Sequence, residues 1–423
     1  MTVSIAHVAY GASRISLQLD GRLAEWRVIA PSFEPALPDP HAAFVRACAH
    51  PIDSPPLRDL VKSTDRVAIV TSDGTRPVPN HLLIPWLLDA LPVPSGQVTV
   101  IIGTGSHRTA TSGEIAAAFG VASRRVRIVS HDAYDSETHE RVGDLGHRFP
   151  VFLNKAYVKA DKCIVVGFIE PHFFAGFSGG PKGIVPGVAG IETILQTHAY
   201  PLIADPRSTW GVLEGNPVHE IIARAAALCP PDFLVNVALN VDKAISAVFA
   251  GHYLSAHRAG CKHVREKATV AVPHAFPVVV TSNSGYPLDQ NLYQSVKGMS
   301  AAARILDPGG TIFMASECRD GLPDHGLFGI TLKRAASREV IDAELRSRLT
   351  PELDQWQVQV LHQVLCQGQV ALYSSLDPQT VKACGLVPVA DLQQSLTQHV
   401  KTLGPGTPVA VMTEGPQTIP YIA

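Results

Sequence analysis

The sequence predicts an α/β protein of two units, each built on a mainly parallel sheet, with a functional site in the cleft between the units. Three observations carry this prediction. Short apolar runs rich in β-branched residues alternate with helical patterns, and this alternation restarts after about residue 270. The 423-residue chain is 46% hydrophobic and 17% charged, which supplies enough apolar material for more than one core.

The first half of the chain contains four runs that are typical of buried strands, followed or separated by helical patterns. The runs are residues 66–72, 97–103, 125–130 and 162–169, and the helical patterns are residues 81–91 and 111–120. The second helix is expected to begin at a Ser or Thr cap with a Glu close behind and to end at Gly120. Residues 1–26 alternate between apolar and polar like a pair of strands.

The second half repeats the pattern with its own strands and helices. Strands are predicted at 276–285, 310–317, 369–375 and 408–415, and helices at 288–305, 336–348, 352–366 and 390–402. Residues 250–272 are predicted to form one long helix that joins the units. We therefore place the domain boundary near residue 270, giving units 1–270 and 271–423.

Composition and charge argue against several classes of protein. The net charge is −2 with both signs spread along the chain, whereas nucleic-acid binding needs a concentrated basic patch. No apolar run approaches the roughly 18 residues of a membrane span, and the N-terminus has no secretory signal pattern, so a cytoplasmic location is expected. The seven cysteines include no C-x-x-C pair, which argues against a zinc ribbon.

Polar residues follow the predicted strands directly, where open α/β sheets bind their ligands. The turn "SDGTRP" (72–77) offers Arg76, which can bind a phosphate or carboxylate or can be a surface residue of a plain turn. The loop "GTGSHR" (103–108) offers His107, either as a general acid or base or as a solvated loop histidine. Neither loop completes a G-x-G-x-x-G dinucleotide fingerprint.

The stretch "FIEPHFFAGFSGGPKGIVPG" (168–187) sets Lys182 inside a glycine-rich loop, with His172 upstream. Such a loop loses much conformational entropy on ordering, so we expect a bound group whose interactions offset this cost. The loop lacks the G-K-[ST] ending of a P-loop, so nucleoside triphosphate hydrolysis is rejected. A lysine in this setting can serve as a nucleophile or a covalent anchor.

A helix after the 276–285 strand is predicted to carry a polar face. Asp289, Tyr293 and Lys297 have the spacing of one helical face, with Gln294 at its edge. This face can bind an anionic ligand or can simply be solvated.

Taken together, the motifs "SDGTRP", "GTGSHR", "EPHFFAGFSGGPKGIVPG", "ILQTHAY" and "LYQSVKG" resemble those of the nickel-dependent lactate racemase family, the nickel-pincer racemases and epimerases of 2-hydroxy acids. The resemblance runs from about residue 60 to beyond 350, in the same order. It implies a nickel pincer nucleotide, a pyridinium mononucleotide with thioamide and thiocarboxylate groups, held covalently by Lys182. It also implies His198 as the protein's nickel ligand, cofactor contacts from the turn formed by Asp73, Gly74, Thr75 and Arg76, and a dependence on the enzymes that make the cofactor.

The resemblance further implies a reaction by proton-coupled hydride transfer. His107 and His172 would exchange the hydroxyl proton on opposite faces of a 2-hydroxy acid, and the α-hydride would move to the cofactor and back. Arg76 or Lys297 would hold the substrate carboxylate beside Tyr293 and Gln294. By the same resemblance, Phe174 and Trp356 stand at apolar positions that line the substrate's side-chain pocket, which favours a small substrate such as lactate, although the polar loop 318–329 can admit a larger one. A hydroxy acid dehydrogenase and a non-catalytic cofactor-binding homologue stay open as alternatives.

Overall fold

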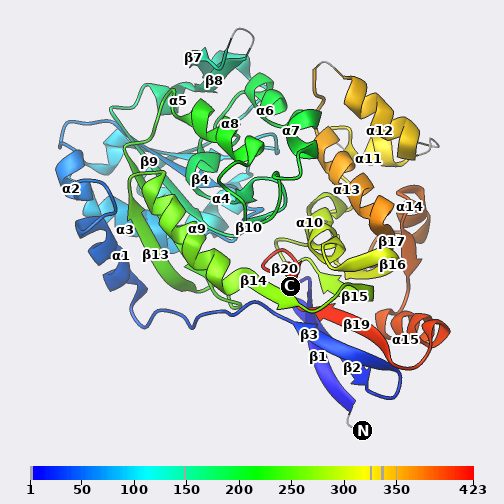
Figure 1. Ribbon diagram of the computed structural model, residues 1–423. Coiled ribbons are helices and arrows are strands. Elements are labelled where there is room, and N and C mark those ends of the chain that lie inside the picture. Colours follow the sequence, from blue (N-terminus) through cyan, green and yellow to red (C-terminus); the bar gives the residue numbers. More distant parts are fainter. Residues whose placement is uncertain (1–2, 147–148, 324–325, 335–337, 349) are drawn as a thin grey trace.

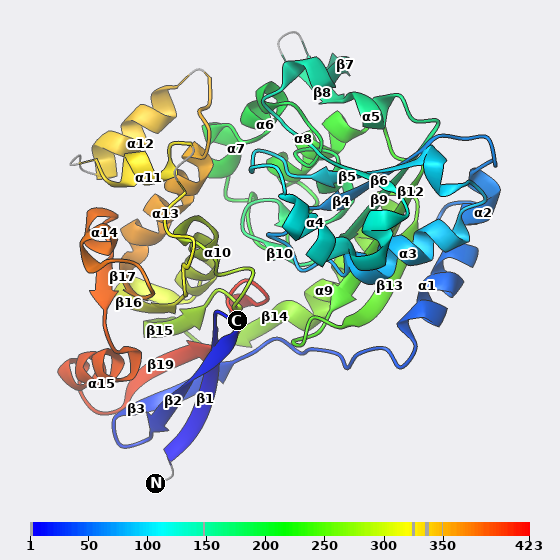
Figure 2. The same cartoon turned by 180° about the vertical axis from the view of Figure 1, so that it is seen from behind.

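The computed structural model describes residues 3–146, 149–323, 326–334, 338–348 and 350–423. Figure 1 shows two lobes, each with a central sheet covered by helices, and Figure 2 shows the same division from behind. The two lobes are here called the first and second units. The predicted α/β class with mainly parallel sheets is confirmed.

The first unit is built on a six-stranded sheet in the order β13-β12-β9-β4-β5-β6. All neighbouring pairs are parallel except β12 and β13. The strands are β4 (Val67–Ser72), β5 (Val98–Gly103), β6 (Arg127–Ser130), β9 (Lys162–Phe168), β12 (Phe233–Leu239) and β13 (Ile245–Gly251). Burial on both faces explains why the sequence of β4, β5 and β9 is nearly continuously apolar. The four predicted strands of this half are confirmed.

Helices cover the first sheet on both sides. They include α1 (Pro40–Ala49), α3 (Asn80–Ala90), α4 (Ser112–Phe119), α6 (Ile191–Thr197), α8 (Pro217–Ala226) and α9 (Ser255–Ala268). The start of α4 is a full capping box, in which Thr111 accepts from the Glu114 backbone and the Glu114 carboxylate accepts from the Thr111 backbone. Gly120 ends this helix with a positive φ of 52°. Both predicted helices of this half are therefore confirmed.

The second unit is built on a fully parallel sheet in the order β18-β17-β16-β15-β19-β3. Its strands are β15 (Phe276–Ser282), β16 (Leu306–Ala315), β17 (Gly368–Tyr373), β18 (Val387–Val389), β19 (Thr407–Met412) and β3 (Ala24–Ile29). Its helices include α10 (Leu292–Ala303), α12 (Arg338–Ser347), α13 (Gln355–Gln367), α14 (Pro378–Ala383) and α15 (Leu392–Leu403). The predicted elements of this half are found, although residues 336–337 of the predicted 336–348 helix lie outside the described residues.

The joining segment differs from its prediction. The helix α9 ends at Ala268, and residues 269–272 form β14 (Thr269–Val272), which pairs with β20 (Ile419–Ile422). A single helix over 250–272 is therefore wrong, because the β-branched run after Ala268 forms an extended strand. The division near residue 270 stays a prediction, and β3 crosses it by hydrogen bonding to β19 of the second sheet. Figures 1 and 2 show the long connection that leads from β3 back to α1 of the first unit.

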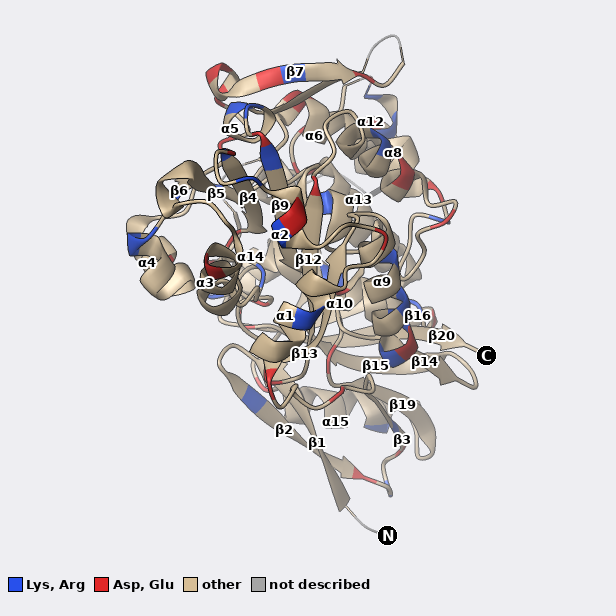
Figure 3. Cartoon of the chain, turned by 90° about the vertical axis from the view of Figure 1, so that its left-hand side faces the viewer, with Lys and Arg blue, Asp and Glu red and all other residues tan. Residues whose placement is uncertain are grey.

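Within the described residues, three antiparallel strand pairs lie outside the two main sheets. The first joins β1 (Val3–Tyr10) to β2 (Ser13–Asp20), as the alternation over residues 1–26 predicted; residues 1–2 lie outside the described part. The second joins β7 (His139–Asp144) to β8 (Pro150–Asn154), and the third joins β10 (Pro171–His172) to β11 (Gly176–Phe177). Figure 3 shows basic and acidic residues interspersed over the elements that face the viewer. Among the described helices, none has both the length and the apolar character needed to cross a membrane.

Candidate active site

A cavity of about 140 Å³ lies where loops at the carboxyl ends of β4, β5 and β9 meet helices α10 and α13 of the second unit. This is about ten times the roughly 10–15 Å³ that one water molecule requires, so a small organic ligand has room. All of the predicted site residues except Gly74 and Asp289 line the cavity. They are Asp73, Thr75, Arg76, His107, His172, Phe174, Lys182, His198, Tyr293, Gln294, Lys297 and Trp356.

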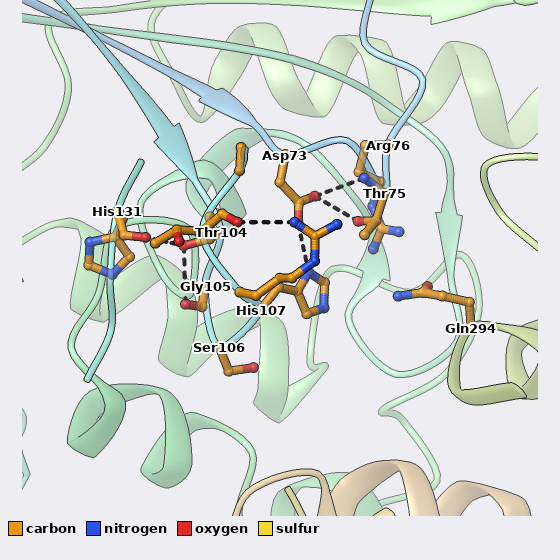
Figure 4. A network of polar contacts seen from close by, with 12 residues as sticks. Asp73, Thr75, Arg76, Thr104, Gly105, Ser106, His107, His131 and Gln294 are labelled. Atoms are coloured by element: carbon orange, nitrogen blue, oxygen red, sulfur yellow. Dashed lines mark hydrogen bonds and ion pairs between the residues drawn. The ribbon is translucent and has the colours of Figure 1, made fainter. Parts of the chain in front are cut away.

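The Asp73 carboxylate orients the ring of His107. Its Oδ2 accepts from His107 Nδ1 at 2.7 Å, and its Oδ1 accepts from the Thr75 hydroxyl at 2.6 Å (Figure 4). Burial raises the pKa of Asp73, but the charge and hydrogen bond of His107 outweigh this effect, so the pKa lies below its usual value. Because Nδ1–H faces the carboxylate, the neutral His107 ring has a free lone pair at Nε2. His107 is thus arranged as a base, and its side chain keeps 30% exposure.

Arg76 belongs to a polar chain that links the two units. Its Nε lies 3.5 Å from Oε1 of the buried Glu170, and Oε2 of Glu170 accepts from Gln417 of the second unit at 2.9 Å. Its Nη1 is buried and makes no hydrogen bond within the described residues. A buried guanidinium nitrogen without a partner carries a desolvation cost, which an anionic ligand would offset.

The lysine loop is packed tightly against the first sheet. Gly180 N–H donates to Asn236 Oδ1 on β12 at 2.9 Å. Gly179 has a φ of +76°, and a Cβ there would lie 2.6 Å from Asn236 Oδ1, so only glycine fits. Burial, followed by the charge of Arg76, lowers the pKa of Lys182 to about 7, and its Nζ lies 5.6 Å from the ring centre of Phe174. An appreciable fraction of this amine is therefore uncharged and nucleophilic at neutral pH.

His172 lies in the short strand β10 (Pro171–His172), which follows β9, and is buried. Its ring centre lies 4.6 Å from that of Phe174 in an edge contact, and its Nδ1 accepts from Ala175 N–H at 3.3 Å. Burial first, and then the charges of Lys182, Lys297 and Arg76, hold its pKa well below the usual range. Since Nδ1 accepts, the neutral ring carries its proton on Nε2, the tautomer opposite to that of His107.

His198 stands directly after α6 with one ring nitrogen fixed by the backbone. Its Nδ1–H donates to the Ile194 carbonyl at 2.9 Å, which leaves the Nε2 lone pair free. Burial, and then the charge of Lys182, lower the pKa of His198 to about 3, so the imidazole is neutral at physiological pH. Trp356 and Phe174 enclose the ring, with centres at 4.7 and 5.5 Å. A neutral imidazole with an oriented free nitrogen is the form that binds transition metals.

No group of three or more His, Cys, Asp or Glu side chains within the described residues is placed to hold a metal ion. A metal at His198 would therefore take further ligands from a bound cofactor or solvent.

The second unit contributes its residues from α10 and α13. Lys297 Nζ donates to Gln294 Oε1 at 2.6 Å, and Trp356 Nε1 donates to the Tyr293 hydroxyl at 2.8 Å. Burial, followed by the charge of Arg76, holds the pKa of Lys297 well below its usual range. These side chains are buried in the cavity wall and do not form a solvated helix face.

The predicted place of Asp289 on that face is wrong. Asn291 caps α10, so Asp289 precedes the helix. The Asp289 carboxylate accepts from the backbone N–H groups of Gly11 and Glu317 at 2.6 and 3.1 Å. It ties the β1–β2 turn to the second unit instead of facing a ligand.

Sequence reasoning assigned no role to three residues that shape the site. Glu170 pairs with Arg76, Asn236 holds the lysine loop, and Gln357 lines the cavity beside Trp356. Asn236 carried a usable signal, since it is a polar residue inside the otherwise apolar run of β12. Of the polar loop 318–329, Asp324 and His325 lie outside the described residues.

Comparisons with known proteins agree with one another. Residues 10–211 match the family model of the lactate racemase N-terminal domain, and residues 273–419 match that of the lactate racemase C-terminal domain. The chain is 38% identical over 379 residues to a lactate racemase of Thermoanaerobacterium thermosaccharolyticum, covering 88% of this chain and 89% of that one. It is 34% identical over 371 residues to a lactate racemase of Lactiplantibacillus plantarum, covering 86% and 87% of the two chains.

The fold is shared with solved structures. The lactate racemase apoprotein of T. thermosaccharolyticum superposes with a TM-score of 0.88 at 35% identity and covers 99% of this chain and 100% of its own. A protein from Thermotoga maritima has a TM-score of 0.68 at 18% identity, covering 86% and 95%, which shows a common fold alone.

Proposed function

This chain belongs to the lactate racemase family, a family of isomerases, and on that premise we propose that it inverts the configuration of a small 2-hydroxy acid, with lactate as the first candidate. The observation that carries the proposal is that two histidines in opposite tautomers, His107 and His172, line one cavity together with Lys182 and His198. Two groups that can each hold or release a proton are what inversion of a hydroxyl-bearing carbon requires, because the hydroxyl points to opposite sides in the two enantiomers.

The residues present fit a nickel pincer nucleotide. Lys182 has an amine that is partly uncharged at neutral pH, as covalent attachment needs. His198 offers one oriented imidazole nitrogen, which is a suitable ligand for nickel(II) and would hold the metal. The unpartnered Arg76 Nη1 suits an anionic group of the nucleotide or the substrate. When bound, this cofactor would supply a reversible acceptor for the substrate's α-hydride.

The side chains of the protein would handle the proton and the carboxylate. His107 Nε2 would accept the hydroxyl proton of one enantiomer, and Asp73 would stabilise the imidazolium that results. His172 would serve the opposite enantiomer from inside the cavity. Arg76 or Lys297 would bind the carboxylate, which also offsets the crowding of cations in this pocket.

The walls of the cavity favour a small side chain on the substrate. Phe174 and Trp356 enclose the space beside His198, and both are buried. The Tyr293 hydroxyl accepts from Trp356, so one of its hydrogen-bonding positions is occupied before a substrate enters. We therefore place lactate ahead of sugar acids.

The test uses protein produced together with the enzymes that make the cofactor. Single enantiomers of a panel of 2-hydroxy acids are supplied without NAD, and the opposite enantiomer is followed by chiral chromatography. Inversion of lactate or a close relative supports the proposal. Absence of inversion across the panel, with nickel and a Lys182 adduct both present by mass spectrometry, contradicts the small-substrate proposal.

A further inference from the structure

Asp354 departs from the usual conformational and hydrogen-bonding preferences of a residue at the start of a helix. It occupies the N-cap position of α13, yet its side chain makes no capping hydrogen bond. Its φ of +65° lies in the left-handed region, and the residue is only 3% exposed. Its Oδ2 is buried without a hydrogen-bond partner in the described part of the chain. Residues that violate local preferences in a packed structure are concentrated at functional sites.

The backbone at Gly326 packs against the carboxyl group of Asp354. A Cβ added to Gly326 would lie 2.1 Å from Asp354 Oδ2, so the backbone at Gly326 lies directly against this oxygen. Gly326 has a φ of +71°, which an L side chain rarely adopts. Gly326 therefore leaves the carboxyl group little space to turn in its direction.

The groups that interact with Asp354 include His107, the catalytic base proposed above. Tyr293 carries the hydroxyl that interacts with Asp354, and the same hydroxyl accepts from Trp356 Nε1 at 2.8 Å. The Tyr293 ring meets the His107 ring edge-on, with centres 6.5 Å apart. His107 and Tyr134 of the first unit both interact electrostatically with Asp354. Asp354 is thus a carboxyl group of the second unit within electrostatic range of His107, whose hydrogen-bonded carboxylate, Asp73, comes from the first unit.

We propose that Asp354 is a positioning residue of this active site, which fixes the Tyr293 hydroxyl and places a second carboxyl group opposite His107 when the two units enclose the cavity. The inference rests on the proposed function and adds a residue to it. An ionised carboxylate here would stabilise the positive charge that develops when His107 accepts the substrate proton. Burial raises the pKa of Asp354 to about 7, against the lowering effects of His107 and Tyr293, so its charge changes within the working pH range.

The test compares Asp354→Asn with Glu352→Gln, both loaded with cofactor. Glu352 is a matched control, because it is an exposed carboxylate two positions away that pairs only loosely with Arg348, at 3.6 Å. The racemisation rate of a single enantiomer is measured from pH 5.5 to 9.5. For Asp354→Asn we expect kcat to fall about tenfold, KM to change less than about twofold, and the acidic limb of the profile to move down by about one pH unit. Glu352→Gln should follow the wild type.

Three results would overturn the inference. They are an unshifted profile in Asp354→Asn, a lower kcat without any shift, and an equal shift in Glu352→Gln. If Asp354→Asn does not fold, Tyr293→Phe decides instead, because it removes the hydroxyl that joins Asp354 to the site; an unchanged kcat and profile in that variant overturns the inference. Inactivity of the wild type on the whole panel contradicts the proposed function itself, whereas an active wild type beside an unaffected Asp354→Asn contradicts this inference alone.

Discussion

Asp73 Oδ2 lies 2.7 Å from Nδ1 of His107, and the second oxygen of the same carboxylate is taken by Thr75. The resemblance to the lactate racemase family had implied that Asp73 contacts the cofactor. That contact stays a prediction, and the geometry shows in addition that the carboxylate has two partners inside the protein. A carboxylate on Nδ1 fixes the ring and its tautomer, and it stabilises the imidazolium that forms when Nε2 accepts a proton.

Replacement of Asp73 by Asn should therefore damage catalysis more than cofactor retention. We expect kcat to fall about 100-fold or more, because the amide cannot stabilise the charged ring and can favour the wrong tautomer. The measurement is kcat beside the mass of the Lys182 adduct in the same sample. Asp320→Asn is the control, since Asp320 is an exposed carboxylate near Arg108 with no contact to His107. Loss of the adduct in Asp73→Asn would show that Asp73 acts chiefly in holding the cofactor.

The amine of Lys182 should react unusually fast at neutral pH. Its pKa of about 7 means that the uncharged, nucleophilic form gains population as the pH rises through 7, whereas an ordinary lysine titrates near 10.4. Labelling of cofactor-free protein with an amine-reactive reagent, followed by peptide mass spectrometry from pH 6 to 9, measures this. Lys182 should reach its limiting rate below pH 8.5, while exposed lysines such as Lys159 continue to accelerate. A Lys182 rate that rises in parallel with the exposed lysines would contradict the prediction. Lys182→Ala should lose the covalent cofactor altogether.

His198→Ala should lower nickel content at equal cofactor loading. The imidazole presents its Nε2 lone pair to the cavity, because Nδ1–H is bound to the Ile194 carbonyl. Nickel per protein is measured by inductively coupled plasma mass spectrometry, and the Lys182 adduct by intact mass. His219→Ala is a suitable comparison, since His219 is buried near the same loop but does not line the cavity. Equal nickel in wild type and His198→Ala would remove His198 from the ligand role.

The buried pair of Arg76 and Glu170 should matter for stability as well as for binding. Glu170→Gln leaves the Arg76 guanidinium without its compensating charge, and breaking such a pair typically costs about 3 kcal/mol in the free energy of unfolding. Urea unfolding at pH 7 measures the loss. Gln417→Ala removes the hydrogen bond to Glu170 but no charge, so its cost should be about 1 kcal/mol. Equal costs for the two variants would show that the charge of Glu170 contributes little.

Much of the fold was predictable because buried parallel strands have a distinctive sequence. The runs of β4, β5 and β9 are apolar at nearly every position, and each is followed by the polar turn that reaches the site. The pairing of β3 with β19 was not predictable, because it joins segments at opposite ends of the chain. The Asp289 error had a local remedy, since Asn291 is a recognisable N-cap and its side chain accepts from Gln294 N–H.

The motif residues of the site were predictable because they directly follow strands whose apolar sequence is easy to recognise. The residues that interact with them, and so set their charge and orientation, were not predictable. Glu170 acquires its importance from Arg76 and Gln417, and Asp354 acquires its importance from Tyr293 and His107, all distant in sequence. Such contacts depend on how the two units pack, which no local pattern encodes.

Asp354 should cost the protein stability at high pH. Its pKa in the folded protein is raised to about 7 from 3.8, so the folded state binds the proton more tightly than the unfolded state. The resulting stabilisation is fully present below pH 4 and is lost as the pH rises through 7. The three-unit difference corresponds to at most about 4 kcal/mol. Asp354→Asn, which stays neutral, should thus gain stability relative to wild type between pH 5 and 9, measured by urea unfolding at each pH. Parallel pH dependence in the two proteins would show that Asp354 is already ionised at acidic pH. A variant that is more stable at pH 9 yet less active would identify a carboxylate retained for catalysis at the expense of folding.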